Sequence, residues 1–419
     1  MVVETRSRLH DLVREDAAHR SLYLDPDVFS MEMRRIFETT WVYVGHESEI
    51  PNPGDFKTDR IGTRPIIVSR HTDGQIYVLL NSCSHRGSTV CELPSGNTKS
   101  FRCPYHSWTY KTNGDLALLP SRDRFGADFD LADYGLTRVA RVASYRGFMF
   151  ASLAEDGPDL DEHLGRAKHY IDIFVDRSPM GCVQVTKPLK YEYQGNWKLQ
   201  MENMSDGYHA QYVHASAFGT SVEPPPDGRS GPEREHLERS FAAGHGIMGW
   251  WTPEIISNKQ ANPEYFSALV ARIGEERAEK LAHMNLHLMV YPNLILHTNY
   301  CHIRVVRPMT VDHTEINTYP CKLEGAGDKL NEKLINATAV HVSPAGRVQV
   351  DDLEVFGRVT AGMRANPLDW VRFKMRGSDE HVNEYGEIES RCTSELVPRG
   401  YYREWLKLMS REPREPEIR

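Results

Sequence analysis

Residues 83–106 read CSHRGSTVCELPSGNTKSFRCPYH and hold two pairs of metal-binding side chains. Cys83 and His85 form a C-x-H, and Cys103 and His106 form a C-x-x-H that follows after seventeen residues. Within each pair the two side chains are so close in the chain that a single turn can present both of them. The pattern therefore predicts two short ligand loops, on hairpin tips, that hold one shared metal centre.

The mixture of ligands in each loop indicates the kind of centre. Two thiolates on one iron and two imidazoles on the other are the ligands of a Rieske [2Fe–2S] cluster. Zinc is the main alternative, but Cys₂His₂ zinc sites usually pair Cys with Cys and His with His. Here each pair is mixed, and four such residues at this spacing also argue against unrelated buried thiols and imidazoles. We therefore expect the chain to carry electrons.

The sequence around these loops predicts a small all-β domain. From about residue 41 to 155, short β-rich pieces such as RPIIVSR and GFMFASL alternate with turn-rich stretches such as PNPGD and KTNGD. Before it, residues 25–41 predict a helix with Asp25 as N-cap and Pro26 at the first helical position.

The remainder of the chain alternates predicted helices and strands. Helices are expected at DLDEHLGRAKHYIDIFV, at 263–283 and at PRGYYREWLKLM, and strands at CVQVTKPLKYEYQGNW, LHLMVYPNLILHTN, CHIRVVRPM and EINTYPCKL. The Pro- and Gly-rich residues 221–235 predict a long surface loop. The predicted fold class is α+β: a small all-β domain inserted before an α+β domain whose antiparallel sheet is flanked by helices. The predicted domains are 1–40, a helical segment that packs on the last domain, then 41–155 and 156–419.

Composition excludes several classes of protein. The chain has 419 residues, of which 40% are apolar and 26% charged, and no apolar run is long enough to span a bilayer. A net charge of −8 gives no basic face for nucleic acid. The N-terminal MVVETRSRLHDLVRED has no secretory signal pattern, and seven scattered Cys suit a reducing compartment. We expect a cytoplasmic protein that binds neither membrane nor nucleic acid.

Residues 195–215, GNWKLQMENMSDGYHAQYVHA, hold a second concentration of metal-binding side chains. His209 and His214 are five apart, so on a regular helix they diverge by about 140°. They share a metal only if the helix is distorted or ends between them. A 2-His-1-carboxylate iron(II) site needs one carboxylate more. Taken alone, two His near an acid are as often structural, but an electron carrier in the same chain needs an acceptor. The carboxylate candidates are Asp206, Asp351 and Asp352.

Together these motifs resemble those of the large (α) subunit of the Rieske non-haem iron aromatic-ring-hydroxylating oxygenases, over essentially the whole chain. The cluster motif of that family, C-x-H and C-x-x-H with C-P-Y-H-S-W, matches residues 83–85 and 103–108. Its catalytic motif, N-W-K followed by E-N-x-x-D-x-Y-H-x-x-x-x-H, matches residues 196–214. Its P-A-G-x-x-x-x-D-D stretch matches residues 344–352.

The resemblance implies a role for each of these residues. The implied ligands of the Rieske [2Fe–2S] cluster are Cys83, His85, Cys103 and His106. The implied ligands of a mononuclear Fe(II) are His209, His214 and Asp352, with Asp351 as the alternative to Asp352. Asp206 is implied as a bridge that hydrogen-bonds His209 and, across a subunit boundary, His106 of a neighbouring chain. Asn203 belongs to the same motif and is counted with the catalytic residues.

The resemblance also implies an activity and its partners. It implies a terminal oxygenase that hydroxylates an aromatic ring with O₂, in a homotrimer of α subunits that can include a small β subunit (α₃β₃). Electrons are expected from a separate reductase, directly or through a ferredoxin, so that NAD(P)H acts only indirectly. Two alternatives stay open: a Rieske electron-transfer protein without oxygenase chemistry, and a monooxygenase or demethylase that uses the same iron site.

The substrate class is suggested by the branch of the family. The chain most resembles the benzoate, salicylate and terephthalate type in NWKLQMENMSDGYH and RGYYREWLKLM, which implies an aromatic carboxylate. A carboxylate calls for a cation, preferably an Arg that can bind it with two hydrogen bonds. The candidates are Arg304, which strand alternation places on the same face as His302, and Arg399. Either Arg can instead form a structural ion pair.

Overall fold

The computed structural model describes residues 9–126, 128–219, 236–252, 255–365, 369–376, 379–391 and 394–411. Contacts divide the chain into two units, Phe37–Leu160 and a unit made of the segments before and after it. The predicted domain limits at 41 and 155 lie a few residues inside the first unit. The predicted loop at 221–235 lies outside the described residues. Among these residues, no helix combines the length and apolar character that a membrane crossing requires.

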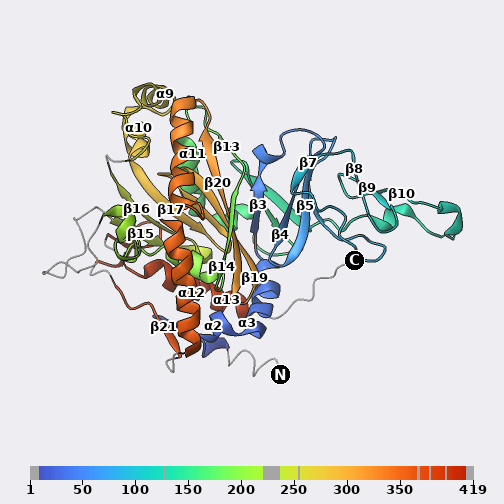
Figure 1. Ribbon diagram of the computed structural model, residues 1–419, viewed down its shortest axis with the longest axis horizontal. Coiled ribbons are helices and arrows are strands. Elements are labelled where there is room, and N and C mark those ends of the chain that lie inside the picture. The colour runs from blue at the N-terminus through green and yellow to red at the C-terminus, as the bar shows by residue number, and fades with distance from the viewer. Residues whose placement is uncertain are drawn as a thin grey trace. The chain divides into compact units, whose positions relative to one another are not determined.

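The Phe37–Leu160 unit consists of three antiparallel sheets (Figure 1). The first holds β4 (Asp55–Ile61), β5 (Arg64–Arg70), β6 (Ile76–Leu80) and β7 (Ser95–Asn97) in the order β6-β5-β4-β7. The second holds β8 (Ser100–Arg102), β9 (Thr109–Lys111) and β10 (Leu116–Leu118), and the third holds β3 (Val42–His46), β11 (Arg141–Tyr145) and β12 (Phe148–Ser152). The prediction of an all-β domain around the cluster motif is confirmed.

The second unit is built on a ten-stranded antiparallel sheet. Its order is β13-β20-β19-β18-β17-β16-β15-β23-β22, and β14 also pairs with β20. The strands are β13 (Val183–Val185), β14 (Leu189–Gln194), β15 (His236–Ser240), β16 (Gly246–Trp251), β17 (Met284–Val290), β18 (Leu294–His297), β19 (His302–Thr310), β20 (His313–Leu323), β22 (His381–Val382) and β23 (Ile388–Ser390). A separate small sheet holds β1 (Val13–Arg14), β2 (Ala17–His19) and β21 (Trp370–Arg372). Hydrophobic alternation identified the longer strands, because successive residues of a strand point to opposite faces of the sheet.

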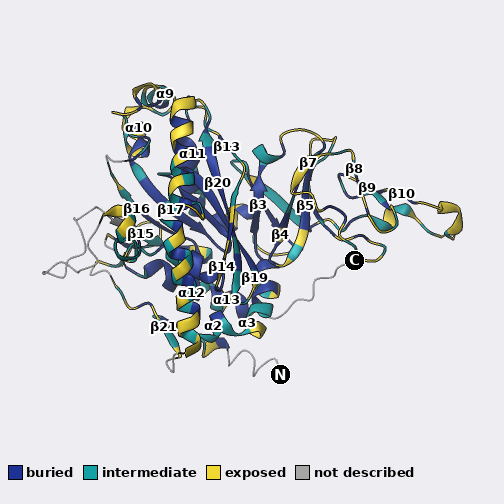
Figure 2. Cartoon of the chain, in the orientation of Figure 1, coloured by how far each residue is buried: buried dark blue, intermediate teal, exposed yellow. Residues whose placement is uncertain are grey.

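The chain also holds helices, several of which contact the strands of this sheet. The long ones are α5 (Ala167–Asp176), α9 (Pro263–Ile273), α11 (Asp328–Val342), α12 (Gln349–Ala365) and α13 (Leu396–Met409). The shorter ones are α2 (Ser21–Leu24), α3 (Pro26–Glu32), α4 (Leu160–Leu164), α6 (Lys198–Asn203), α7 (Ala210–Val213), α8 (Ala215–Phe218) and α10 (Glu275–Ala282). In Figure 2 the exposed residues of α11 and α12 form an outer stripe, while the strands behind them are largely buried. The α+β prediction is confirmed for the described residues.

Three predicted helices differ in length or continuity from the structure. Asp25 caps α3 as expected, but the helix continues only as a π-helical turn, Met33–Phe37, and stops short of residue 41. The helix predicted at 263–283 is two helices, because Gly274, with φ of +81°, breaks it. Gly165, with φ of +44°, likewise separates α4 from α5. Positive φ suits glycine, and periodicity alone does not reveal such breaks.

One row of side chains crosses five strands on a single face of the large sheet. Directly paired residues on neighbouring strands point to the same face. The pairs are Glu238 with Met248, Met248 with His287, His287 with His297 and His297 with His302. The face that carries this row is called the histidine face below.

Helices α12 and α13 cover the histidine face on either side of its centre. On one side, the ring of Tyr193 in β14 packs 4.8 Å from the ring of Phe356 in α12. Tyr191, two residues earlier on the same strand, forms a hydrogen bond with Thr318 of β20. On the other side, Gly400 of α13 lies directly against Ser240 of β15. A Cβ added at Gly400 would lie 1.8 Å from Ser240 Oγ and 3.0 Å from its Cβ. A glycine inside this helix therefore permits close contact between helix and sheet.

We predict that Gly400→Ala destabilises the protein by about 2–3 kcal/mol, because Ser240 is only 3% exposed and has little room to move. The matched control is Gly362→Ala in α12, where an added Cβ meets nothing within 4 Å. In that variant the free energy of unfolding should rise by up to about 1 kcal/mol, because Ala has a higher helix propensity than Gly. Urea unfolding followed by circular dichroism measures both. Equal effects of the two substitutions would contradict the close-contact explanation.

Candidate metal centres and active site

The two cluster loops are built by the same pair of backbone hydrogen bonds. The amides of Cys83 and Cys103 donate to the carbonyl five residues further on, at 2.9 and 2.8 Å. The amides of Gly87 and Ser107, four residues after each Cys, donate back to the Cys carbonyl at 2.8 and 3.0 Å. Both of these residues have positive φ, +74° and +60°. The second loop joins β8 to β9 in a hairpin, as predicted, whereas the first leaves β6 without forming a hairpin with β7.

The four predicted cluster ligands lie together in these loops. The Cys83 and Cys103 side chains are buried, and the rings of His85 and His106 lie 4.6 Å apart. Nδ1 of each of these two rings is buried and has no hydrogen-bond partner. A buried ring nitrogen without a partner costs free energy, and iron coordination would offset that cost. Two thiols and two free imidazole nitrogens therefore fit a Rieske [2Fe–2S] cluster.

Neighbouring residues adjust these ligands. Trp108 stacks on His85, with ring centroids 4.8 Å apart and planes 4° from parallel. The Tyr110 hydroxyl lies 3.0 Å from Cys83 Sγ. Burial alone would raise the pKa of Cys103, but hydrogen bonds from the backbone of Tyr105 and His106 leave that pKa below its ordinary value. The backbone hydrogen bonds thus favour the thiolate form of Cys103, the form that a metal binds.

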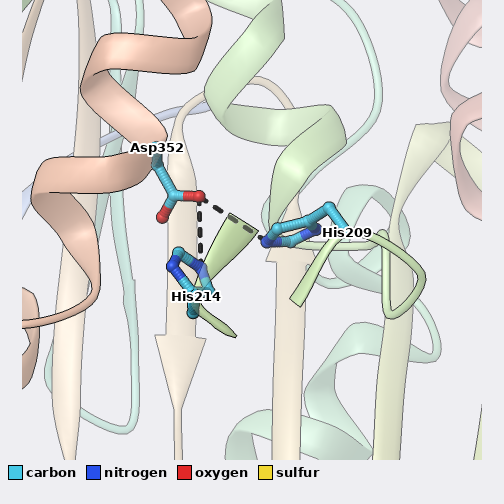
Figure 3. Close-up of side chains that lie close together, drawn as sticks. All are labelled: His209, His214 and Asp352. Atoms are coloured by element: carbon cyan, nitrogen blue, oxygen red, sulfur yellow. Dashed lines mark ion pairs between the residues drawn. The ribbon is translucent and has the colours of Figure 1, made fainter. Parts of the chain in front are cut away.

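The second site gathers His209, His214 and Asp352 (Figure 3). The two His flank α7, which is only one turn long, so the helix ends between them, as their five-residue spacing requires. Asp352, in the first turn of α12, places Oδ1 3.6 Å from His209 Nε2 and 3.3 Å from His214 Nε2. One ligand atom from each of the three lies within 4.8 Å of the others. Two imidazole nitrogens and one carboxylate oxygen are the donor set of a non-haem iron(II) site.

Each His of this site turns its other nitrogen toward a second carboxylate. His209 Nδ1 lies 3.5 Å from Asp206 Oδ2, and His214 Nδ1 lies 3.3 Å from Asp351 Oδ2. Burial lowers the pKa of His209, but the interaction with the Asp206 carboxylate outweighs burial and the pKa is raised. Carboxylates in this position fix the tautomer and orientation of a metal-binding imidazole. The adjacent acids thus divide their tasks: Asp352 faces the three-residue centre and Asp351 faces the outside of His214.

Asn203, at the end of α6, belongs to the same constellation. Its Nδ2 donates to Asp352 Oδ1 at 3.0 Å and lies 3.1 Å from His209 Nε2. The structure therefore brings every predicted residue of the catalytic motif to one place, although they come from segments about 150 residues apart in the chain.

The two predicted Arg candidates differ. Arg304 is 2% exposed, directs one η-nitrogen to Met204 Sδ at 3.1 Å, and leaves Nε buried without a hydrogen-bond partner. It forms no ion pair with any residue that the structure describes. Arg399 is also buried, but it pairs with Glu380 and donates to the carbonyls of Phe373 and Met375. Arg399 thus makes the structural ion pair that the sequence left open.

Family comparisons agree with both centres. Residues 40–145 match the Rieske [2Fe–2S] domain, and residues 181–410 match the ring hydroxylating alpha subunit (catalytic domain). The chain belongs to the ring-hydroxylating oxygenase alpha subunits. It is an enzyme of the Rieske oxygenase family, with a [2Fe–2S] cluster and a mononuclear iron as cofactors. A Rieske electron-transfer protein without oxygenase chemistry, the first alternative, does not account for the catalytic domain.

Relatives and solved structures cover most of the chain. Toluate 1,2-dioxygenase subunit alpha of Pseudomonas putida is 33% identical over 404 residues, which cover 90% of this chain and 87% of the relative. Anthranilate 1,2-dioxygenase large subunit of Acinetobacter baylyi is 34% identical over 373 residues, 84% of this chain and 78% of the relative. The structure of naphthalene 1,2-dioxygenase with bound indole has a TM-score of 0.86 at 27% identity and covers 96% of this chain and 94% of that one.

One sequence match has no functional counterpart. Residues 244–249, GHGIMG, fit the G-x-G-x-x-G pattern of dinucleotide-binding folds. That pattern is informative only between a strand and the helix that follows it in a parallel βαβ unit. Here the residues run into β16 of an antiparallel sheet, and β16 is paired with β15 and β17. The match therefore indicates no nicotinamide or flavin site.

Sequence reasoning matched Glu202 to the motif but did not assign it a role. Its carboxylate accepts hydrogen bonds from the hydroxyls of Tyr23, at 2.8 Å, and Tyr402. Burial raises the pKa of Glu202 to about 7, against 4.5 ordinarily. The two Tyr lie near opposite ends of the chain, so no local pattern could reveal the contact.

We predict that Glu202→Gln flattens the pH dependence of stability between pH 4.5 and 7. In this window the folded protein binds more protons than the unfolded chain, so the free energy of unfolding falls as pH rises. Removing the titrating group lessens that slope by up to about 1.4 kcal/mol per pH unit. Urea unfolding at a series of pH values measures it. The surface control Glu264→Gln should keep the wild-type slope, and an unchanged slope in Glu202→Gln would contradict the prediction.

Proposed function

We propose that this alpha subunit is a terminal oxygenase that hydroxylates the ring of an aromatic carboxylate. The observation that carries the substrate class is Arg304. A buried guanidinium without a carboxylate partner is costly, and a substrate carboxylate would supply that partner. The relatives named for toluate and anthranilate support the same class.

The position of Arg304 supports a role in substrate binding. It contacts Met204, which follows Asn203 directly in the chain and precedes Asp206 by two residues. The guanidinium therefore lies against the segment that carries the iron site. The electric charge of Arg304 would hold the carboxylate at one end of the ring and so fix which ring carbons face the iron.

When bound, the cluster would deliver electrons and the mononuclear iron would activate O₂. The chain's own residues hold these centres. The proposed cluster ligands are Cys83, His85, Cys103 and His106, and the proposed iron ligands are His209, His214 and Asp352. Asp206 and Asp351 hold the outer nitrogens of the iron-binding His, and Asn203 holds Asp352 in place. Asp206 is further proposed to bond His106 of a neighbouring subunit.

The same proposal covers assembly and partners. A bridge between subunits implies a closed, head-to-tail ring, which we propose to be a homotrimer, with or without a small β subunit. Electrons would come from a reductase, directly or through a ferredoxin. We propose a cytoplasmic location, where the Cys thiols stay reduced. Ring monooxygenation or demethylation at the same iron is the alternative outcome, and product masses distinguish it from dihydroxylation.

The test of the substrate class is turnover with a surrogate reductase. We predict that the wild-type enzyme converts benzoates and that Arg304→Met lowers kcat/KM for them by about 100-fold or more, because the substrate carboxylate loses its partner. Arg304→Lys should recover part of this loss, since it restores the charge without the planar fork. The matched substrate control is naphthalene, which has no carboxylate, so Arg304→Met should lower kcat/KM for naphthalene less than it does for benzoates. Equal losses on both substrates, or no turnover of any benzoate, would refute the proposal.

We predict that Asp206→Asn retains about three irons per chain and a reducible cluster but loses nearly all turnover. The amide keeps the shape of the side chain but not the charge that supports His209 and the proposed contact with the next subunit. Metal analysis and reduction of the cluster with dithionite check the first part, and single-turnover oxygenation checks the second. Wild-type turnover in this variant would disprove the bridge.

A further inference from the structure

Three imidazoles lie side by side on the histidine face. The ring centroids of His287 and His297 are 4.2 Å apart, and those of His297 and His302 are 5.0 Å apart with planes 4° from parallel. All three side chains come from directly paired positions on β17, β18 and β19. The rings of His297 and His302 are nearly parallel, so their nitrogens do not aim at a common point, and the group of described residues that could hold a metal is His209, His214 and Asp352 instead.

His287 and His297 each form a hydrogen bond through one ring nitrogen. His287 Nδ1 lies 3.2 Å from the Met204 carbonyl, to which it donates. His297 Nδ1 accepts from the amide of Tyr300 at 3.2 Å. His302 is different: it is 0% exposed, and neither ring nitrogen has a hydrogen-bond partner.

Burial favours the uncharged form of the imidazoles in this row. Desolvation lowers the pKa of His287 to about 4 and that of His302 well below its ordinary value, and the nearby charge of Arg304 acts in the same direction. At neutral pH His302 therefore offers one N–H donor and one acceptor nitrogen, both buried. A ligand group that donates or accepts a hydrogen bond can therefore pair with one of these two nitrogens.

The surroundings of His302 connect it to the proposed substrate site. His302 and Arg304 are two residues apart on β19, on one face, so their Cα atoms are separated by about 7 Å. Met204, next to the iron site, contacts both Arg304 and His287. The unpartnered nitrogens of Arg304 and His302 thus lie on the face that the iron-site segment covers, at a separation comparable to the length of a substituted benzoate.

We propose that His302 is a specificity-determining residue that binds a second polar substituent, a hydroxyl or amino group, on the ring of the carboxylate substrate. This inference rests on the proposed function, in which Arg304 binds the carboxylate. Arg304 then selects for the acid, and His302 selects among acids. A hydroxyl or amino group can pair with one ring nitrogen of His302, either as donor to the unprotonated nitrogen or as acceptor from the N–H, whereas a methyl group or hydrogen leaves both nitrogens unpaired.

The test compares benzoate with its 2-, 3- and 4-hydroxy and amino derivatives. We predict that at least one derivative binds and turns over at least 10-fold better than benzoate in the wild-type enzyme. In His302→Leu the ratio of kcat/KM for that derivative to kcat/KM for benzoate should fall about 10-fold. His302→Gln, which keeps a donor and an acceptor, should retain part of the preference. Kd values from titration calorimetry should follow the same ratios.

Further controls separate specificity from folding. His341→Phe replaces an imidazole that stacks on Tyr300 further along the same group of rings, 4.9 Å between centroids, and should leave the ratio unchanged. Thermal unfolding and iron content show whether each variant is folded and contains its metals. If His302→Leu is unfolded, the comparison of His302→Gln with wild type decides.

A wild-type enzyme that prefers benzoate, or variants that affect all benzoates equally, would overturn the role of His302 alone. An enzyme that converts no aromatic carboxylate would overturn the proposed function itself.

Discussion

The buried carboxylate of Glu32 is the interaction on which the catalytic unit depends. Glu32 and Lys198 are both fully buried and form an ion pair at 2.6 Å, and the indole nitrogens of Trp197 and Trp405 donate to the same carboxylate at 2.9 and 2.7 Å. The group joins α3, α6 and α13, which are far apart in the chain. Every oxygen is satisfied by a charged or strong donor, which is the condition under which a buried ion pair is tolerated. Because α6 ends at Asn203 and the chain then runs on to His209, this group also positions the segment that begins the candidate iron site.

The sequence predicted those features whose cause is local. The mixed Cys and His pairs indicated the cluster, and alternation indicated the strands because burial on one face imposes a two-residue period. Hydrophobic periodicity did not predict the helix breaks at Gly165 and Gly274, because one glycine changes the backbone without changing the hydrophobic pattern. The pairing of Glu202 with two tyrosines, and of Arg399 with Glu380, depends on which segments meet in the fold. Such contacts carry no local signal, so the choice between Arg304 and Arg399 needed the structure.

The iron site shows how a short irregularity creates chemistry. A regular helix would separate His209 and His214 around its circumference, but α7 ends after one turn and lets both rings face Asp352. Each ring then has one nitrogen toward the centre and one toward an outer acid. The three inner ligand atoms are thereby held by side chains that do not themselves take part in binding. The same division is present at the cluster, where backbone hydrogen bonds shape the loops and leave the histidine Nδ1 atoms free.

Strand β17 presents alternate residues to two different faces of the large sheet. His287 and Met289 belong to the histidine face, while Leu286, Leu288 and Val290 have the opposite parity and are at most 2% exposed. Met289 is as buried as the residues of the opposite parity, so both faces of the strand are packed and differ in what they pack against. In the proposed function, a substitution at His287 would change the side chains beside Met204 and Arg304, whereas a substitution at Leu288 would change packing on the opposite face of the sheet.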